Sequence, residues 1–207
     1  ADNADFTRRA DPEKLPTKLV KKLKDVGKIE VTIDKKRVKI RNGGIPIVVS
    51  PGINVGDKLI PLTIFGELNS STNYDDDETI RTGSGRNGVG GKIVSIFSTY
   101  YRVAIGDSIN GQEFEAIWTG NMTELSYLSV TPGYKVDKKG YYIREGDSYI
   151  PNEGKKYKGE PYVEIEYELD FERFGYKKYP KEAFGILAQR TLFMAMSTKM
   201  LVSINGV

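Results

Sequence analysis

A glycine-rich stretch directly before a helix-like pattern reads Gly83-Ser84-Gly85-Arg86-Asn87-Gly88-Val89-Gly90-Gly91-Lys92. Glycines let successive backbone N–H groups converge on one point, because no Cβ atom stands in the way. The start of a helix adds unpaired N–H groups and the positive end of the helix dipole. The stretch therefore predicts an anion site suited to phosphate groups, with Arg86 and Lys92 as sources of positive charge.

Two better-known phosphate motifs do not fit this stretch. A P-loop needs Gly-Lys followed by Ser or Thr, whereas Ile93 follows Lys92. The dinucleotide-binding fingerprint needs a buried strand that leads into it, and no such pattern precedes Gly83. Taken by itself, the stretch is equally compatible with a flexible loop that ends in a helix cap.

The patterns on both sides of this stretch predict an α+β fold. Alternating or short apolar runs predict strands at residues 28–34, 37–41, 101–105, 112–118, 124–130, 162–169 and 201–204. Three- and four-residue spacing of apolar side chains predicts helices at residues 59–68, 89–98 and 181–199. Residues 50–58 and 69–91 are predicted loops, and residues 133–160, rich in Tyr, Lys and Gly, are predicted to be an inserted hairpin or mobile loop. This order favours a two-layer domain.

Charge is unevenly distributed along the chain. The net charge of +3 is too small to indicate nucleic acid binding by itself. Residues 14–41, however, carry eleven Lys or Arg and three acidic residues, a net +8, which leaves −5 elsewhere. A basic arm at residues 7–27 includes a predicted amphipathic helix, whose lysines Lys18, Lys21 and Lys22 are candidates for DNA contact. A solvated helix face explains the same lysines equally simply.

Composition excludes several classes of chemistry. The chain contains no Cys and no His, which excludes disulfide scaffolds, Cys- or His-based zinc sites, thiol nucleophiles and every catalytic triad that needs an imidazole. No apolar run approaches the roughly 20 residues of a membrane span. No charged and then apolar leader opens the sequence. We therefore expect an intracellular protein, in the cytoplasm or nucleus, with no membrane partner.

Several motifs follow one another in a set order along the chain. They are Ala1-Asp2-Asn3, Gly43-Gly44-Ile45-Pro46, Ser70-Ser71-Thr72-Asn73-Tyr74-Asp75-Asp76-Asp77-Glu78, the stretch 82–92, and Ile96-Phe97-Ser98-Thr99. In this order they resemble the N-terminal ATPase domain of type IIA DNA topoisomerases of the eukaryotic and large-virus kind. That domain belongs to the GHKL ATPase superfamily. The divergent turn and the insertion are also compatible with a viral or phage source.

The resemblance carries expectations about fold and function. It implies a mixed β-sheet covered on one face by helices, with the N-terminal helix truncated, and residues 1–207 as one fragment of a GHKL-type ATPase domain. It implies ATP and Mg2+ as cofactors. In the intact enzyme, which we expect to be a homodimer, nucleotide binding would drive closure of a dimeric gate for ATP-dependent passage of one DNA duplex through another.

The resemblance also implies the nucleotide-binding residues. The triphosphate would be wrapped by Gly85, Arg86, Asn87, Gly88, Val89, Gly90, Gly91 and Lys92. Ser71, Thr72 and Asn73 would lie near the ribose and phosphates, and Asn42 would read the adenine amino group. The acidic run Asp75–Glu78 is expected to be a solvated part of a lid-like loop, and not a metal site.

Three departures from the family pattern limit these expectations. The general-base Glu and the magnesium-binding Asn would both precede residue 1, so this chain alone is not expected to hydrolyse ATP. The Ile-Pro turn is one residue short, which places either Arg41 or Asn42 at the adenine position, and Arg has only donors. Val163 stands about where the family has a Thr.

Two other functions fit the same sequence. The +8 stretch and the altered adenine contacts would suit a non-catalytic DNA- or protein-interaction module with a degenerate nucleotide pocket. Another GHKL protein, such as a chaperone or histidine kinase, is the third alternative. The Ser-Thr-Asn-Tyr-Asp-Asp-Asp-Glu segment favours the topoisomerases over that alternative.

Overall fold

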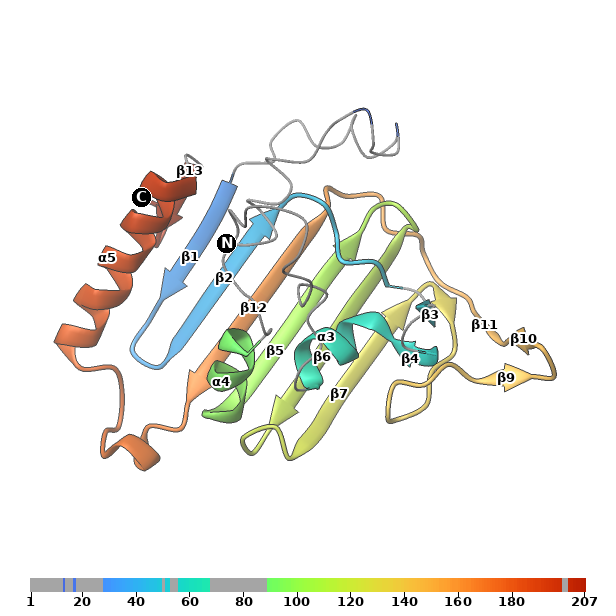
Figure 1. The fold of residues 1–207 in the computed structure, drawn as a ribbon, viewed down its shortest axis with the longest axis horizontal. Helices are drawn as coiled ribbons and strands as arrows, with labels where there is room; N and C mark the ends of the chain where they lie inside the picture. Colours follow the sequence, from blue (N-terminus) through green and yellow to red (C-terminus); the bar gives the residue numbers. More distant parts are fainter. Residues whose placement is uncertain are drawn as a thin grey trace, which may run out of the picture.

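A seven-stranded mixed sheet forms the frame of the molecule (Figure 1). The computed structural model describes residues 28–49, 51–52, 56–67, 89–198 and 201–207, together with Glu13 and Thr17. The strand order is β13-β1-β2-β12-β5-β6-β7, in which β1 and β13 are parallel and every other neighbouring pair is antiparallel. The strands are β1 (Lys28–Ile33), β2 (Arg37–Gly43), β5 (Ser98–Asp107), β6 (Gln112–Thr119), β7 (Glu124–Thr131), β12 (Tyr162–Leu169) and β13 (Leu201–Ile204). All seven strands predicted from the sequence are confirmed.

Strand register gives the sheet one apolar face. Asn42 of β2 lies opposite Val163 of β12, which lies opposite Ile105 of β5. Two residues further along each strand, Ile40, Ile165 and Val103 are aligned in the same way. Because side chains alternate between the two faces of a sheet, these rows point to one side, which we call the helix face.

Three helices cover the helix face. They are α3 (Ile60–Gly66), α4 (Gly90–Ile96) and α5 (Lys181–Thr198), and a short 3-10 helix, η2 (Glu172–Phe174), precedes α5. Figure 1 shows α3 and α4 side by side over β12, β5, β6 and β7, while α5 lies beside β1 and β13. Leu62 of α3 belongs to the larger apolar core under that helix. Leu187 of α5 packs against a second apolar cluster formed by residues of β1 and β2. The predicted α+β sandwich with helices on one face is confirmed. None of the helices in the described part of the chain is both long and apolar enough to span a membrane.

Charged side chains occupy the opposite face of the sheet. Arg102 of β5 donates to Glu164 of β12 at 2.6 Å and to Glu115 of β6 at 2.5 Å. Arg37 of β2 donates to Glu168 at 3.1 Å. These charges therefore pair with one another on the face opposite the described helices.

Residues 133–160, which were predicted to be inserted and which we call the insertion, lie between β7 and β12 at the β7 end of the sheet (Figure 1). It contains β8 (Gly133–Tyr134), β9 (Arg144–Glu145), β10 (Ser148–Tyr149) and β11 (Pro151–Asn152), which pair as β8 with β11 and β9 with β10. The rings of Tyr134, Tyr142 and Tyr149 pack together with centroids 5.3 to 6.0 Å apart. Residues 133–160 therefore contain two short antiparallel strand pairs and a small aromatic core, which agrees with a hairpin; whether the segment is inserted relative to the family stays a prediction.

The prediction of a plain loop at residues 50–58 is wrong. This segment contains β3 (Pro51–Gly52) and most of β4 (Gly56–Leu59). The backbone of β4 is held by the insertion: Leu59 N–H donates to the Gly140 carbonyl at 3.0 Å, and Tyr142 N–H donates to the Asp57 carbonyl at 2.7 Å. Those partners lie about 80 residues away, so no local pattern of apolar residues signals the strand.

Candidate nucleotide site

The start of α4 places a buried lysine beside open space. The helix begins at Gly90, and a Cβ added at Gly90 or Gly91 would meet no heavy atom within 4 Å. Lys92, in the first turn, is only 4% exposed. The predicted helix after the glycine-rich stretch is thus confirmed, and among the described residues nothing stands within 4 Å of a Cβ at Gly90 or Gly91.

Fixed contacts hold α4 in place. Ser98 at the start of β5 donates its hydroxyl to the Val94 carbonyl at 2.7 Å. Asn121 in the β6–β7 turn donates its Nδ2 to the Ile96 carbonyl at 3.0 Å, and Asp170 N–H donates to the Phe97 carbonyl at 2.8 Å. The last turn of α4 is therefore satisfied by three separate parts of the fold, which fixes the direction of its first turn.

Lys92 carries a charge in a poorly solvated place. Burial lowers the pKa of the Lys92 ammonium, and the negative charge of Glu67 opposes that shift in part. A buried cation is expensive unless an anion compensates it. A phosphate placed above the first turn of α4 would add to the compensation that the Glu67 charge supplies.

Asn42 lies on the same face of the sheet, near the end of β2. It is 7% exposed, and its Nδ2 donates to the Gly43 carbonyl at 2.8 Å. This contact uses one of the two N–H donors of the amide, and the Oδ1 atom is the group that can accept from a ligand. Its cross-strand neighbour Val163, only 4% exposed, offers no hydroxyl at the position where the family has a Thr.

Arg41 lies on the other face, so it does not compete with Asn42 for the adenine position. Its guanidinium donates to Glu164 at 3.2 Å and lies 3.7 Å from the centre of the Tyr162 ring. Since adjacent residues of a strand point to opposite faces, only one of the two side chains can point to the helix face. The register places Asn42, and not Arg41, on the helix face, and its adenine contact stays a prediction.

A buried carboxylate missed in the sequence analysis supports the turn after β2. Asp107, at the end of β5, is 0% exposed. It accepts from Val49 N–H at 3.1 Å, from Ile109 N–H at 2.9 Å and from the Asn110 side chain at 2.7 Å. It therefore ties the segment that follows Asn42 to β5. The signal for it was an Asp before a Ser-Ile-Asn-Gly turn, which is typical of a carboxylate that caps local N–H groups.

The structure brings only part of the predicted site together. Asn42, Val89, Gly90, Gly91 and Lys92 are described, and Asn42 and Lys92 belong to elements on the helix face. The other predicted nucleotide contacts lie outside the described residues: Ser71, Thr72, Asn73, Gly85, Arg86, Asn87 and Gly88. The DNA-contact candidates Lys18, Lys21 and Lys22 also lie outside them and stay predictions.

Much of the basic stretch is paired where the structure describes it. Lys36 lies 3.8 Å from Glu168, and Arg37 lies within 3.4 Å of both Glu166 and Glu168. Three glutamates of β12 thus neutralise three cations of residues 36–41 across the strand pair. The net +8 of residues 14–41 is therefore not a continuous basic surface in this part of the chain.

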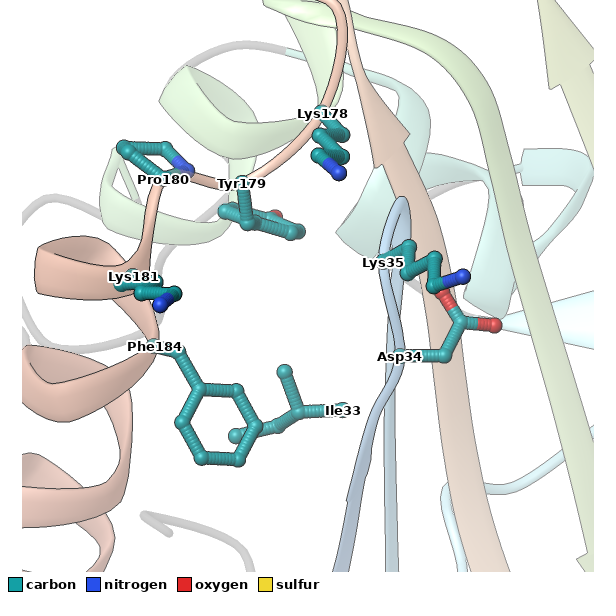
Figure 2. A pocket seen from close by; sticks show the side chains of 8 residues that line it. All are labelled: Ile33, Asp34, Lys35, Lys178, Tyr179, Pro180, Lys181 and Phe184. Atoms are coloured by element: carbon teal, nitrogen blue, oxygen red, sulfur yellow. The ribbon is translucent and has the colours of Figure 1, made fainter.

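A pocket of about 330 Å3 lies away from the candidate site, between the β1–β2 turn and the start of α5 (Figure 2). It is lined by Ile33, Asp34, Lys35, Lys178, Tyr179, Pro180, Lys181 and Phe184. The turn precedes the first residue of β2, whereas Asn42 lies near the last. The pocket contains no predicted nucleotide contact and is not part of the site.

The mixed sheet with helices on one face agrees with the fold expected of an ATPase domain of the GHKL type. No protein-family model matches the chain. Among curated proteins, DNA topoisomerase 2 of Plasmodium falciparum (isolate K1 / Thailand) is 32% identical over 181 residues, which is 86% of this chain and 11% of the relative. Human DNA topoisomerase 2-alpha is 32% identical over 183 residues, 86% of this chain and 10% of the relative.

Solved structures agree with these relatives. The ATPase region of Saccharomyces cerevisiae topoisomerase II bound to ICRF-187 (dexrazoxane) superposes with a TM-score of 0.72 at 28% identity, covering 87% of this chain and 42% of that one. The ATPase and transducer domains of Balamuthia mandrillaris DNA topoisomerase II give 0.72 at 25% identity, covering 99% and 44%. The chain is homologous to the ATPase region of type IIA DNA topoisomerases, and it spans about a tenth of the length of its curated relatives.

Proposed function

We propose that this chain, residues 1–207, binds ATP as part of the ATPase domain of a type II DNA topoisomerase. In the intact enzyme, an intracellular homodimer acting on DNA, nucleotide binding would drive gate dimerisation for strand passage. The observation that carries the proposal is the buried Lys92 in the first turn of α4, on the same sheet face as Asn42. Homology over most of the chain supports it.

The two described side chains would have different tasks. Lys92 would supply a charge-assisted contact to a phosphate oxygen, which is stronger in a site with little water than on an open surface. Asn42 would accept a hydrogen bond from the adenine amino group through Oδ1, while one of its two amide N–H donors holds the Gly43 carbonyl. Guanine has a carbonyl at the corresponding position and would be rejected. The site therefore favours ATP over GTP.

Magnesium is implied by the family but is not supported by a protein site in the described residues. No group of three or more acidic side chains could hold a metal ion in the part of the chain that the structure describes. Mg2+ in nucleotide sites is commonly bound through substrate phosphates and few protein groups. Mg2+ would then be held mainly through the triphosphate.

The proposal is tested by titrating the full-length protein with non-hydrolysable analogues of ATP and GTP in a calorimeter. We expect saturable binding of the ATP analogue and at least ten-fold weaker binding of the GTP analogue, since a lost or opposed hydrogen bond in a buried site has this magnitude. Asn42→Ala should reduce the difference between the two nucleotides. Absence of ATP-analogue binding would overturn the proposal. Light scattering with and without the analogue tests the dimer.

A further inference from the structure

The pocket between the β1–β2 turn and the start of α5 combines an apolar floor with a rim of lysines (Figure 2). Ile33 and Phe184 supply apolar surface, and Phe184 is still 40% exposed. Figure 2 shows Lys35, Lys178 and Lys181 at separate points around the opening. A mostly apolar cavity with a few convergent polar groups is the usual form of a binding site.

The charge around this pocket is positive. Its lining contains three lysines and one aspartate, a net +2. The Asp34 carboxylate is engaged in the β1–β2 turn, where it accepts from Lys36 N–H at 2.7 Å and from Arg37 N–H at 2.6 Å. Within the described part of the chain, none of the three lining lysines forms an ion pair, whereas neighbouring Lys36 lies 3.8 Å from Glu168. The opening therefore favours an anionic ligand.

Fixed contacts hold the walls of the pocket in place. Tyr179 N–H donates to the Lys35 carbonyl at 3.0 Å, which joins the segment before α5 to the β1–β2 turn. The Tyr179 ring packs edge-on against Phe171, with centroids 5.0 Å apart. Ile33 N–H donates to Asn205 Oδ1 at 2.8 Å. Because the walls are already ordered, a ligand binds with little loss of conformational freedom in the protein.

The shape and lining of the pocket favour a peptide over a nucleic acid strand. Base edges carry donors and acceptors that need partners, and the side chains of Ile33, Pro180 and Phe184 offer none. A groove for single-stranded nucleic acid has cations along a track, whereas these lysines surround one opening. The volume of about 330 Å3 is at the low end of the roughly 300–1,000 Å3 of ligand sites. It therefore suits a single large side chain.

We propose that this pocket binds an acidic peptide segment of a partner protein. One large apolar side chain of the peptide enters between Ile33 and Phe184, and flanking carboxylates pair with Lys35, Lys178 and Lys181. The interaction is additional to the proposed nucleotide function and does not rest on it, because the pocket contains no predicted nucleotide contact.

Fluorescence anisotropy with the full-length protein tests the proposal. The probe is a labelled synthetic peptide, Glu-Asp-Asp-Phe-Asp-Glu-Glu, at physiological ionic strength, and we expect saturable binding. The same peptide with Ser in place of Phe should bind at least about ten-fold more weakly, the factor that burial of one aromatic side chain supports. Equal binding of the two peptides, or no binding of either, would overturn the proposal.

Two double variants of the protein provide the matched comparison. Lys178→Met with Lys181→Met should weaken binding of the Phe peptide about five- to twenty-fold, as the loss of two partly exposed ion pairs allows. Lys177→Met with Lys158→Met removes the same charge from exposed positions that do not line the pocket. It should change affinity less than about two-fold, because distant exposed charges are screened.

Equal effects of the two double variants would overturn the proposal. So would tighter binding of a single-stranded oligothymidylate than of the Phe peptide, with the same dependence on Lys178 and Lys181. Affinity for the ATP analogue should be unchanged in both double variants, and thermal melting should match that of the wild-type protein, since all four lysines are exposed. Failure of peptide binding with analogue binding intact would overturn this inference and leave the nucleotide function standing.

Discussion

Replacing Lys92 by Met should lower nucleotide affinity without lowering stability. A charge-assisted hydrogen bond contributes about 1.5–3 kcal/mol net, which corresponds to about a 10- to 150-fold loss of affinity. The side chain is 4% exposed and burial disfavours its charged form. Met fills a similar volume without a charge, so the free energy of unfolding of the unliganded protein should stay equal or rise by up to about 1 kcal/mol.

The pH dependence of the free energy of unfolding provides a second, independent test of the burial of Lys92. The folded-state pKa of Lys92 is lowered from its usual 10.5, so the unfolded chain binds more protons between the two values. The penalty on the folded wild-type protein is complete below the folded pKa and disappears as the pH rises past 10.5. The stability advantage of Lys92→Met should therefore be largest near neutral pH and vanish in strong alkali.

Calorimetry with the non-hydrolysable ATP analogue and urea unfolding at several pH values measure both effects. Lys39→Met is the control for loss of one lysine, because β2 places Lys39 on the face opposite Asn42. Unchanged nucleotide affinity in Lys92→Met would refute the reasoning. So would a loss of more than about 1 kcal/mol of stability with the affinity preserved, which would make Lys92 a structural residue.

Three further predictions concern stability, each measured by urea unfolding. Gly140→Ala should lower the free energy of unfolding by about 2–3 kcal/mol, because φ is +83° and the new Cβ would lie 1.9 Å from a leucine methyl of α3. Gly146→Ala, at φ +60° with nothing within 4 Å, should lower it by only about 1 kcal/mol. Equal losses would contradict the proposed clash between the new Cβ at Gly140 and α3. Burial raises the pKa of Glu164, but hydrogen bonds from Arg102 and a second arginine outweigh it and hold that pKa below its usual 4.5. The stabilisation by ionised Glu164 is therefore present above pH 4.5 and lost as the pH falls through the folded pKa. Glu164→Gln should then lower the free energy of unfolding at pH 7 and lower it less at pH 3. A loss of stability that does not depend on pH would contradict this role of the carboxylate. Asp107→Asn should cost about 2–3 kcal/mol, since an amide N–H₂ would face a backbone donor in a fully buried place, and a neutral result would show that the carboxylate is not needed there.

Local patterns predicted the elements of this fold well but not its long-range contacts. Tyr162–Leu169 alternates so regularly that the strand is readable from sequence. The strand at Gly56–Leu59 is not readable, because its backbone partners lie in the insertion. Arg37 looked like part of a basic surface, yet its partner Glu168 lies 131 positions away. Charge counted along a chain cannot show which cations a distant strand neutralises.

The candidate site shows the same division between local and distant information. The start of α4 follows from glycines and helix spacing alone. The choice between Arg41 and Asn42 depended on which face of β2 is covered, and the sequence by itself left both open. Glu67 forms an ion pair with Lys58, and its charge raises the pKa of Lys92. Local patterns could not predict these two interactions, because one lysine precedes Glu67 in the sequence and the other follows it.

The central place of β12 in the sheet has a consequence for how the chain folds during synthesis. The β1–β2 hairpin and the β5-β6-β7 meander each consist of neighbours in sequence, and β12 joins them only after residue 162 has been made. Until then β2 and β5 each expose a strand edge that is ready to pair with another chain. Closure of the sheet is therefore a late, long-range event, and the growing polypeptide depends on residues 162–169 to protect the edges of β2 and β5.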